Sequence, residues 1–241
     1  MKLQNLRLIV QFLSFTFFVV LVSGAFCTFT VGTIPLVEPL GFLQVIASSK
    51  LRIGITLALG GVLVILFVIF TRRFFCGWFC PIGFIIDLVD RFYKAPNPHS
   101  KKTKCKEVLA ITVISASAVS GTPVWCTLCP VGAICRGIGL GGIFAPIETA
   151  LLTTLALAPE FKSKRWFCRN LCPIAGVINI LSKISQRGLR ITVDRDACVN
   201  CKLCSKVCPM GLELENYSTD DCILCLNCYE KCPKGAIKIN F

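Results

Sequence analysis

The sequence predicts an all-α domain of four transmembrane helices, residues 1–189, followed by a small α+β domain, residues 190–241. The chain is 54% hydrophobic with a mean hydropathy of +0.72, which soluble globular domains rarely reach. Residues 190–241 are instead polar and charge-balanced, with seven basic and seven acidic side chains. The net charge of +13 therefore lies among the apolar stretches, which favours membrane topology over a nucleic-acid surface.

Four apolar stretches are each long enough to cross a bilayer, which takes about 20 residues. They are residues 6–26, 51–70, 108–125 and 138–157. The first stretch lacks the small-x-small cleavage site of a signal peptide, so we expect an uncleaved helix there.

The basic residues predict how these helices are oriented. Eight Lys and Arg lie in residues 72–106 and six in residues 162–187, whereas the loops 27–50 and 126–137 carry one each, Lys50 and Arg136. By the positive-inside rule both termini face the cytoplasm and the two poorly charged loops face outward. We therefore expect a multi-pass protein of the cytoplasmic (inner) membrane.

Eight of the 17 cysteines form two matching runs, C-x2-C-x2-C-x3-C-P, in residues 198–209 and 222–233. In two-cluster bacterial ferredoxins this spacing supplies three ligands to one cluster and the fourth to the other. We predict a first [4Fe-4S] cluster on Cys198, Cys201, Cys204 and Cys232, and a second on Cys222, Cys225, Cys228 and Cys208. Zinc sites also use C-x2-C pairs, but two complete runs, each with its proline, favour clusters. The domain thus resembles a 2[4Fe-4S] ferredoxin.

Two C-x3-C-P motifs follow the second and fourth apolar stretches on the cytoplasmic side, with the pairs Cys76/Cys80 and Cys168/Cys172. Proline favours the first position of a helix, and a helix N-terminus favours an anionic ligand. The four thiolates suffice for a third [4Fe-4S] cluster at the inner face. Its negative charge would be offset by Arg72, Arg73, Arg165 and Arg169.

Four cysteines on the outward side, Cys27, Cys126, Cys129 and Cys135, form a candidate fourth cluster site. Disulfides, or buried cysteines that behave as small hydrophobes, are the alternatives for both membrane-face groups. For Cys27 the hydrophobic interpretation is as good as ligation. Cys105, among lysines in a cytoplasmic loop, is expected to be a free thiol.

The remaining polar residues predict less chemistry. Glu148, within the fourth stretch, is equally compatible with proton transfer and with a hydrogen-bonded place near the outer interface. Asp87 and Asp90 are expected on a solvated helix face. The single histidine, His99, lies in a polar loop, so no haem is expected. The sequence predicts no catalytic site of its own.

With these motifs the chain resembles the NapH-type (NapH-, NosR- and MauN-like) membrane-bound 4Fe-4S polyferredoxins. The resemblance covers nearly the whole chain and rests on the four apolar stretches, the two C-x3-C-P motifs and the double ferredoxin motif. It implies electron transfer between the quinone pool and other redox proteins. The outer cysteine group departs from the simplest family members and favours an electron route across the membrane.

The sequence therefore predicts an iron–sulfur electron-transfer subunit of a membrane redox complex. It would connect a cytoplasmic partner with the membrane quinone pool or an extracytoplasmic acceptor, and no nucleic acid is expected as partner. One alternative is a NapH-like quinol dehydrogenase subunit with the two ferredoxin clusters alone. Another is a maturation or thiol-reducing factor for a periplasmic client, in which Cys126 and Cys129 pass electrons to a disulfide.

Overall fold

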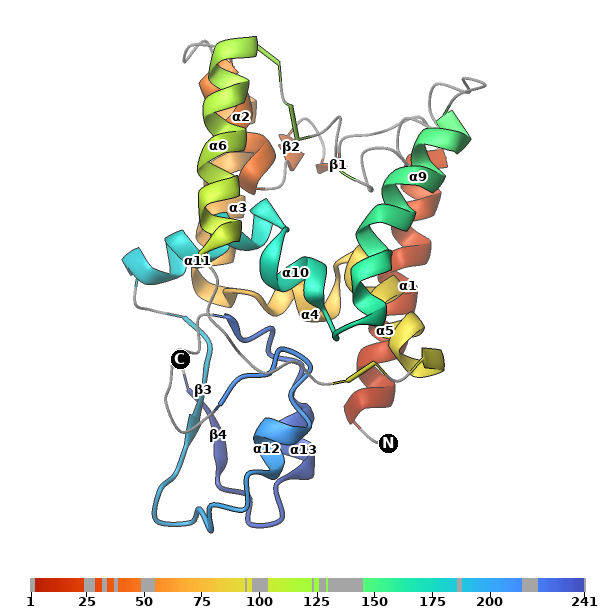
Figure 1. Ribbon diagram of the computed structural model, residues 1–241. Coiled ribbons are helices and arrows are strands. Elements are labelled where there is room, and N and C mark those ends of the chain that lie inside the picture. Colours follow the sequence, from red (N-terminus) through yellow and green to blue (C-terminus); the bar gives the residue numbers. More distant parts are fainter. Residues whose placement is uncertain are drawn as a thin grey trace.

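The computed structural model describes most of the chain. The described residues are 3–23, 29–31, 34–36, 39–48, 55–93, 95–96, 104–122, 124–125, 129, 145–185, 188–213 and 221–240. Long helices stand on one side of the molecule and a small cysteine-rich domain on the other, with short helices between them (Figure 1). The described part of the chain begins and ends on the side of the small domain (Figure 1).

Each predicted apolar stretch contains a helix. These helices are α1 (Leu3–Ser23), α3 (Ile55–Thr71), α6 (Cys105–Ser120) and α9 (Ala145–Leu157). Gly121, with a φ of 70°, closes α6 in the left-handed conformation, and its N–H donates to Ser117 O at 3.0 Å. Within the described residues, none of the helices combines the length and the apolar character needed to cross a bilayer.

The segment predicted as the first outward loop contains regular structure. The short strands β1 (Phe29–Val31) and β2 (Ile34–Leu36) pair antiparallel, and the helix α2 (Pro39–Ser48) follows them. With ten residues α2 is too short to span a bilayer. It packs against α6, with Leu40 and Phe42 buried. Helix α2 is therefore part of the core, although its segment is predicted as a loop.

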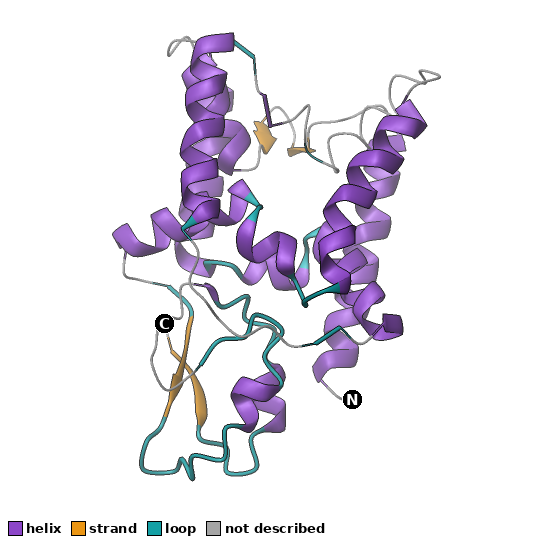
Figure 2. Ribbon diagram, in the orientation of Figure 1, coloured by secondary structure: helices purple, strands orange, loops and turns teal. Residues whose placement is uncertain are grey.

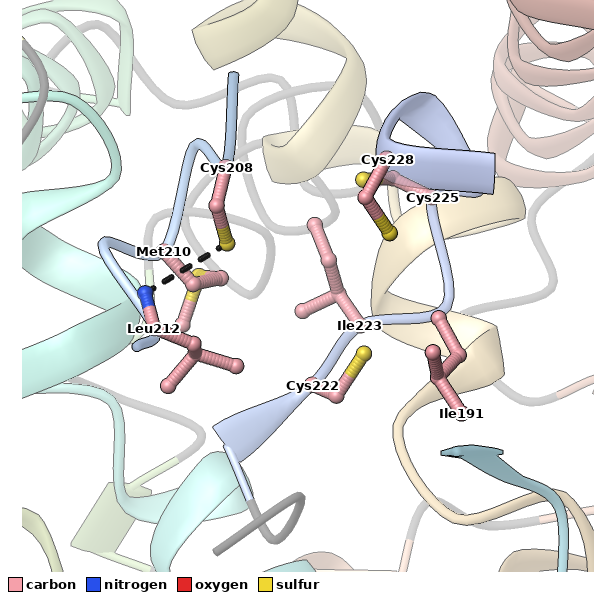
Figure 3. A pocket seen from close by; sticks show the side chains of 8 residues that line it. All are labelled: Ile191, Cys208, Met210, Leu212, Cys222, Ile223, Cys225 and Cys228. Carbon is pink, nitrogen blue, oxygen red and sulfur yellow. Dashed lines mark hydrogen bonds between the residues drawn. The ribbon is translucent and has the colours of Figure 1, made fainter. Parts of the chain in front are cut away.

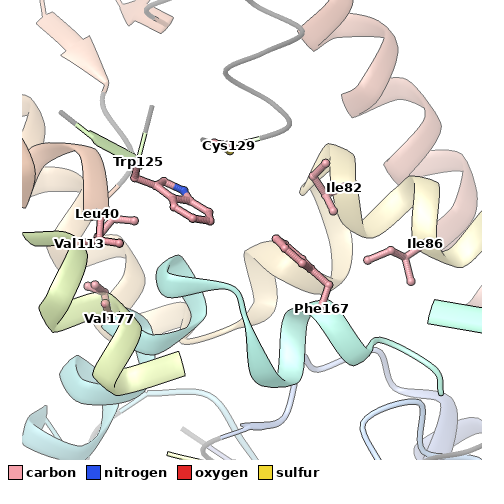
Figure 4. Packing of buried hydrophobic residues seen from close by; sticks show 9 residues of the cluster. Leu40, Ile82, Ile86, Val113, Trp125, Cys129, Phe167 and Val177 are labelled. Carbon is pink, nitrogen blue, oxygen red and sulfur yellow. The ribbon is translucent and has the colours of Figure 1, made fainter. Parts of the chain in front are cut away.

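Two short helix pairs lie between the long helices and the small domain (Figure 1). The first is α4 (Phe74–Trp78) with α5 (Pro81–Tyr93), and the second is α10 (Trp166–Asn170) with α11 (Pro173–Ser185). A 3₁₀ turn, η1 (Ala158–Phe161), precedes α10. Helix α1 packs on α5, and α6 packs on α11. Figure 4 shows the main apolar core here, with Trp125 and Phe167 between Leu40 on one side and Ile86 on the other.

The small domain is an α+β unit (Figure 2). Strands β3 (Arg190–Val193) and β4 (Ile237–Asn240) pair antiparallel, with Val193 opposite Ile237. The helices α12 (Leu203–Lys206) and α13 (Asn227–Lys231) each begin shortly after the second cysteine of one ferredoxin motif and contain the third. Ile191 and Ile237 form its core together with Leu224 and Cys228.

Candidate iron–sulfur sites

One cavity in the small domain is lined by four cysteines from the two ferredoxin motifs (Figure 3). Cys208 approaches from the first motif, and Cys222, Cys225 and Cys228 come from the second. The cavity holds about 350 Å³, part of it open to solvent, and its other lining is apolar: Ile191, Met210, Leu212 and Ile223. These are the four cysteines that the sequence assigns to the second cluster.

The backbone around this cavity suits thiolates bound to a cluster. The N–H of Leu212 donates to Cys208 Sγ at 3.5 Å, and that of Leu224 to Cys222 Sγ at 3.4 Å. Leu224 and Leu226 flank Cys225 with φ values of 51° and 59°, a left-handed conformation that costs a non-glycine residue about 1–3 kcal/mol. Such strain bends the loop around a central space, which is what a cluster ligated three times by one loop requires.

The first predicted cluster site has the same loop geometry but lies nearer to solvent. Asn200 and Lys202 flank Cys201 with φ values of 54° and 56°, matching the pair around Cys225. Cys198 and Cys201 are exposed, whereas Cys204 and Cys232 are half-buried and border the core of the small domain. The two predicted sites therefore differ in access, because the cysteines of the first are more exposed to solvent than those of the second.

The structure also brings together the four inner-face cysteines, Cys76, Cys80, Cys168 and Cys172. We call them the inner quartet. The pKa of Cys76 is raised to about 11 and that of Cys80 to about 12, mainly by burial and in part by neighbouring quartet thiols. The pKa of Cys172 is raised by burial and by all three of its partners. Thiols with raised pKa values become thiolates when bound metal supplies the compensating charge.

The inner quartet is built from two copies of one local structure. In each copy a five-residue helix, a two-residue break and a thirteen-residue helix follow one another. The second cysteine of each copy donates its N–H to an equivalent phenylalanine carbonyl, Cys80 to Phe75 and Cys172 to Phe167, both at 3.0 Å. Pro81 and Pro173 then begin the longer helices. The motif repeat in the sequence is thus a structural repeat.

Two buried guanidiniums accompany the quartet, one from each copy. Arg73 and Arg165 lie three residues before the first cysteine of their motifs, and each is 1% exposed. They lower the pKa values of the Cys76 and Cys168 thiols, although burial raises both overall. Among the described atoms, Nε of both arginines and Nη1 of Arg165 have no acceptor. Buried, unpaired donors beside four thiols fit an anionic thiolate-bound cluster.

The quartet and the ferredoxin cysteines do not converge as ligands of one metal ion do. Within the described ranges, no three His, Cys, Asp or Glu side chains are grouped to hold a single ion.

Comparisons with known proteins bear on these sites directly. A 4Fe-4S binding domain model matches residues 53–98 and 108–147, a 4Fe-4S dicluster domain model matches 166–212, and a 4Fe-4S binding domain model matches 216–238. The ferredoxin-type protein NapH of Escherichia coli is 29% identical over 73% of this chain and 61% of its own length. The methylamine utilization ferredoxin-type protein MauN of Methylorubrum extorquens is 28% identical over 78% of this chain and 66% of its own.

The chain is similar to the NapH and MauN ferredoxin-type proteins over most of its length. It spans less than two thirds of E. coli NapH, but 85% of an uncharacterised protein of Methanocaldococcus jannaschii to which it is 28% identical. No solved structure matches it. The relationship to NapH and MauN and the 4Fe-4S matches support an iron–sulfur electron-transfer role for this chain.

The candidate outer site is described at one of its four cysteines. Cys27, Cys126 and Cys135 lie outside the described residues. Cys129 is buried in the core with Trp125, and its N–H donates to Trp125 O at 2.8 Å (Figure 4). Cys105, expected as a free thiol, is exposed at the start of α6. Glu148 lies on helix α9, and its side chain is not among those that the structure describes.

The expectation that Asp87 is solvated was wrong. Its carboxylate accepts two 2.7 Å hydrogen bonds from Arg165 Nη2, a third from Gln11 Nε2 at 2.8 Å, and an ion pair with Arg7. Burial raises the pKa of Asp87, but Arg165 and Arg7 outweigh this effect and hold the pKa below its ordinary value. Asp90, one helical turn later, is half-buried and pairs with Lys164 at 3.2 Å.

A buried acid that the sequence analysis did not single out, Glu160, supports the second motif. Its carboxylate accepts the N–H groups of Trp166 at 3.1 Å and Phe167 at 2.8 Å, and so caps the start of α10. Burial raises the pKa of Glu160 to about 7 in spite of these hydrogen bonds. An acid eight residues before a C-x3-C-P motif was the available signal, but a capping role depends on the tertiary turn at η1.

Proposed function

We propose that the chain is an integral-membrane electron-transfer subunit. It would carry electrons between a cytoplasmic redox partner and the quinone pool or an extracytoplasmic acceptor. The ferredoxin cysteines and the inner quartet hold [4Fe-4S] clusters, which supply one-electron transfer when bound. The polypeptide holds these clusters in a fixed spatial order, shields the inner ones from water and balances their charge.

One observation carries this proposal: the inner quartet adjoins the cavity of the second ferredoxin cluster. Cys76 of the quartet packs against Met210, Ile223 and Cys225, and the latter three also line that cavity. Phe74, beside it on α4, packs against the core of the small domain. The two candidate sites are therefore in contact through side chains, as an electron route requires.

The surface of the long helices supports a place in the membrane. Large apolar side chains are exposed along α1, α3 and α6, an area far beyond the scattered apolar residues of a soluble surface. They include Phe12, Leu13, Phe17, Leu59, Leu63, Phe67, Val108 and Ile111. Near the start of α1, Gln4 Nε2 donates to Cys225 O at 2.8 Å, so the N-terminal helix begins at the ferredoxin side. This supports a topology with both termini on one side.

Replacing Cys76 by serine tests the inner cluster. We expect Cys76→Ser to lose about four of the irons bound per chain, because a cluster that lacks one thiolate ligand is not retained, and to keep the ferredoxin signal in electron paramagnetic resonance spectra. Cys105→Ser is the matched control: it removes an exposed thiol and should leave the iron content unchanged. An unchanged iron content in Cys76→Ser would instead favour the quinol dehydrogenase with two clusters.

The orientation can be read from Cys105 itself. We expect a membrane-impermeant maleimide to label Cys105 in inside-out vesicles and to leave it unlabelled in intact spheroplasts, since the loop before α6 is predicted to be cytoplasmic. The Cys105→Ser variant identifies labelling at other cysteines. Equal labelling in spheroplasts would overturn the topology, whatever the number of clusters.

A further inference from the structure

The two helix pairs that carry the inner quartet have equivalent residues at matching positions, but one pair of equivalent residues differs in charge. Asp87 lies six residues after Pro81, and Asn179 lies six residues after Pro173. In the first copy the acid at this position, Asp87, neutralises Arg165 of the second copy. If the two copies were alike in charge, an acid at position 179 would neutralise Arg73 of the first copy. The residue at that position is Asn179, whose amide carries no charge.

The ferredoxin domain supplies a carboxylate at that place. Asp221 Oδ1 accepts a hydrogen bond from Asn179 Nδ2 at 3.0 Å and lies 3.1 Å from Arg73 Nη2. Lys106, at the start of α6, pairs with the same oxygen. Each carboxylate therefore joins an arginine of the quartet to a basic residue near the start of a long helix, Arg7 on α1 and Lys106 on α6.

We infer that Asp221 is the counter-ion which the second copy lacks, so that docking of the ferredoxin domain completes the charge balance of the inner quartet. Asp221 is thus a positioning residue: it directly precedes Cys222 and fixes that end of the second cluster site against Arg73. This inference rests on the proposed function, because it takes the quartet to hold a cluster.

Further contacts hold the same face of the ferredoxin domain. Trp78 Nε1 donates to Leu224 O at 2.9 Å. Arg73 and Lys106, the two cations facing Asp221, are 1% and 3% exposed, so this is a buried ionic contact and not a surface pair. All these contacts involve the loop of the second cluster site. The first site, where Cys198 and Cys201 are exposed, remains accessible to a cytoplasmic partner.

The test compares three variants: Asp221→Asn, Asn179→Asp and the double variant that carries both. In the purified holoprotein, hydrogen exchange of the 221–228 segment measures how firmly the ferredoxin domain is docked. Redox titration of the inner-cluster resonance gives the reduction potential, which responds to the charge around the inner quartet. Asp221→Asn should raise the exchange and shift the potential upward, because Arg73 and Lys106 lose their counter-charge. The double variant should return the potential toward that of the wild type but keep the raised exchange. Asp194→Asn, which removes a partly exposed acid paired with Lys238, is the control.

Asn179→Asp alone keeps the inference testable even where Asp221→Asn does not fold. Two carboxylates beside Arg73 should shift the potential downward and weaken docking by mutual repulsion. Unchanged exchange and potential in these variants, with the inner-cluster signal present, would overturn the inference and leave the proposed function standing. A wild-type protein without an inner-cluster signal would overturn the proposed function and the charge-balance role together, while the exchange data would still decide whether Asp221 docks the domain.

Discussion

Asp87→Asn is expected to lower the free energy of unfolding by about 3–5 kcal/mol, because it leaves two buried guanidiniums without a counter-charge. Arg165 is 1% exposed and Arg7 is 7% exposed, and both face the Asp87 carboxylate. Asp90→Asn on the same helix is the matched control. Its partner Lys164 is about a quarter exposed, so this change should cost about 0–1 kcal/mol. Denaturant titration in detergent measures both, and equal losses would contradict the account.

The pH dependence of the Asp87 contribution has a definite sign. Since its pKa is held below the ordinary value of about 3.9, the ionised network stabilises the fold above that pH. The contribution is lost as the pH falls through the lowered pKa of the folded state. The stability difference between wild type and Asp87→Asn should therefore be flat from about pH 8 to 5 and narrow only below about pH 4. A difference that already narrows near neutral pH would show that Asp87 is not held ionised by the two arginines.

Gly77→Ala is expected to separate the ferredoxin domain from the inner quartet. A Cβ at this position would lie 2.2 Å from Ile223 O, and a backbone carbonyl cannot move aside as a flexible side chain can. We expect faster hydrogen exchange of the 221–228 segment and slower electron exchange between the ferredoxin clusters and the inner cluster. Phe75→Ala, which changes an exposed side chain on the same helix, is the control. Unchanged exchange in Gly77→Ala would show that the close contact of α4 with the second cluster site does not hold the domain.

The local patterns in the sequence predict much of this arrangement. Cysteine spacing groups Cys208 with Cys222, Cys225 and Cys228, and the same four line one cavity. The repeated C-x3-C-P motif predicts short helices that begin at Pro81 and Pro173. Apolar runs place a helix in each of the four stretches, because long apolar segments satisfy their backbone internally as helices.

The features that could not be predicted depend on tertiary contacts. Asp87 has the local pattern of a solvated acid, and its burial follows from Arg165, 78 residues further along the chain. Asp221 lies in a polar motif loop, and its partners Arg73 and Lys106 come from two other segments. Helix α2 lies in a stretch predicted as a loop, because a segment of ten residues that are mostly apolar is too short for its periodicity to identify a helix.

The number of irons and acid-labile sulfides per purified chain tests the central claim most directly. The two ferredoxin sites account for about eight of each, and the inner quartet adds about four. We predict at least about twelve irons with a matching amount of sulfide. A value of about eight would contradict the account, since it would leave the inner quartet without a cluster.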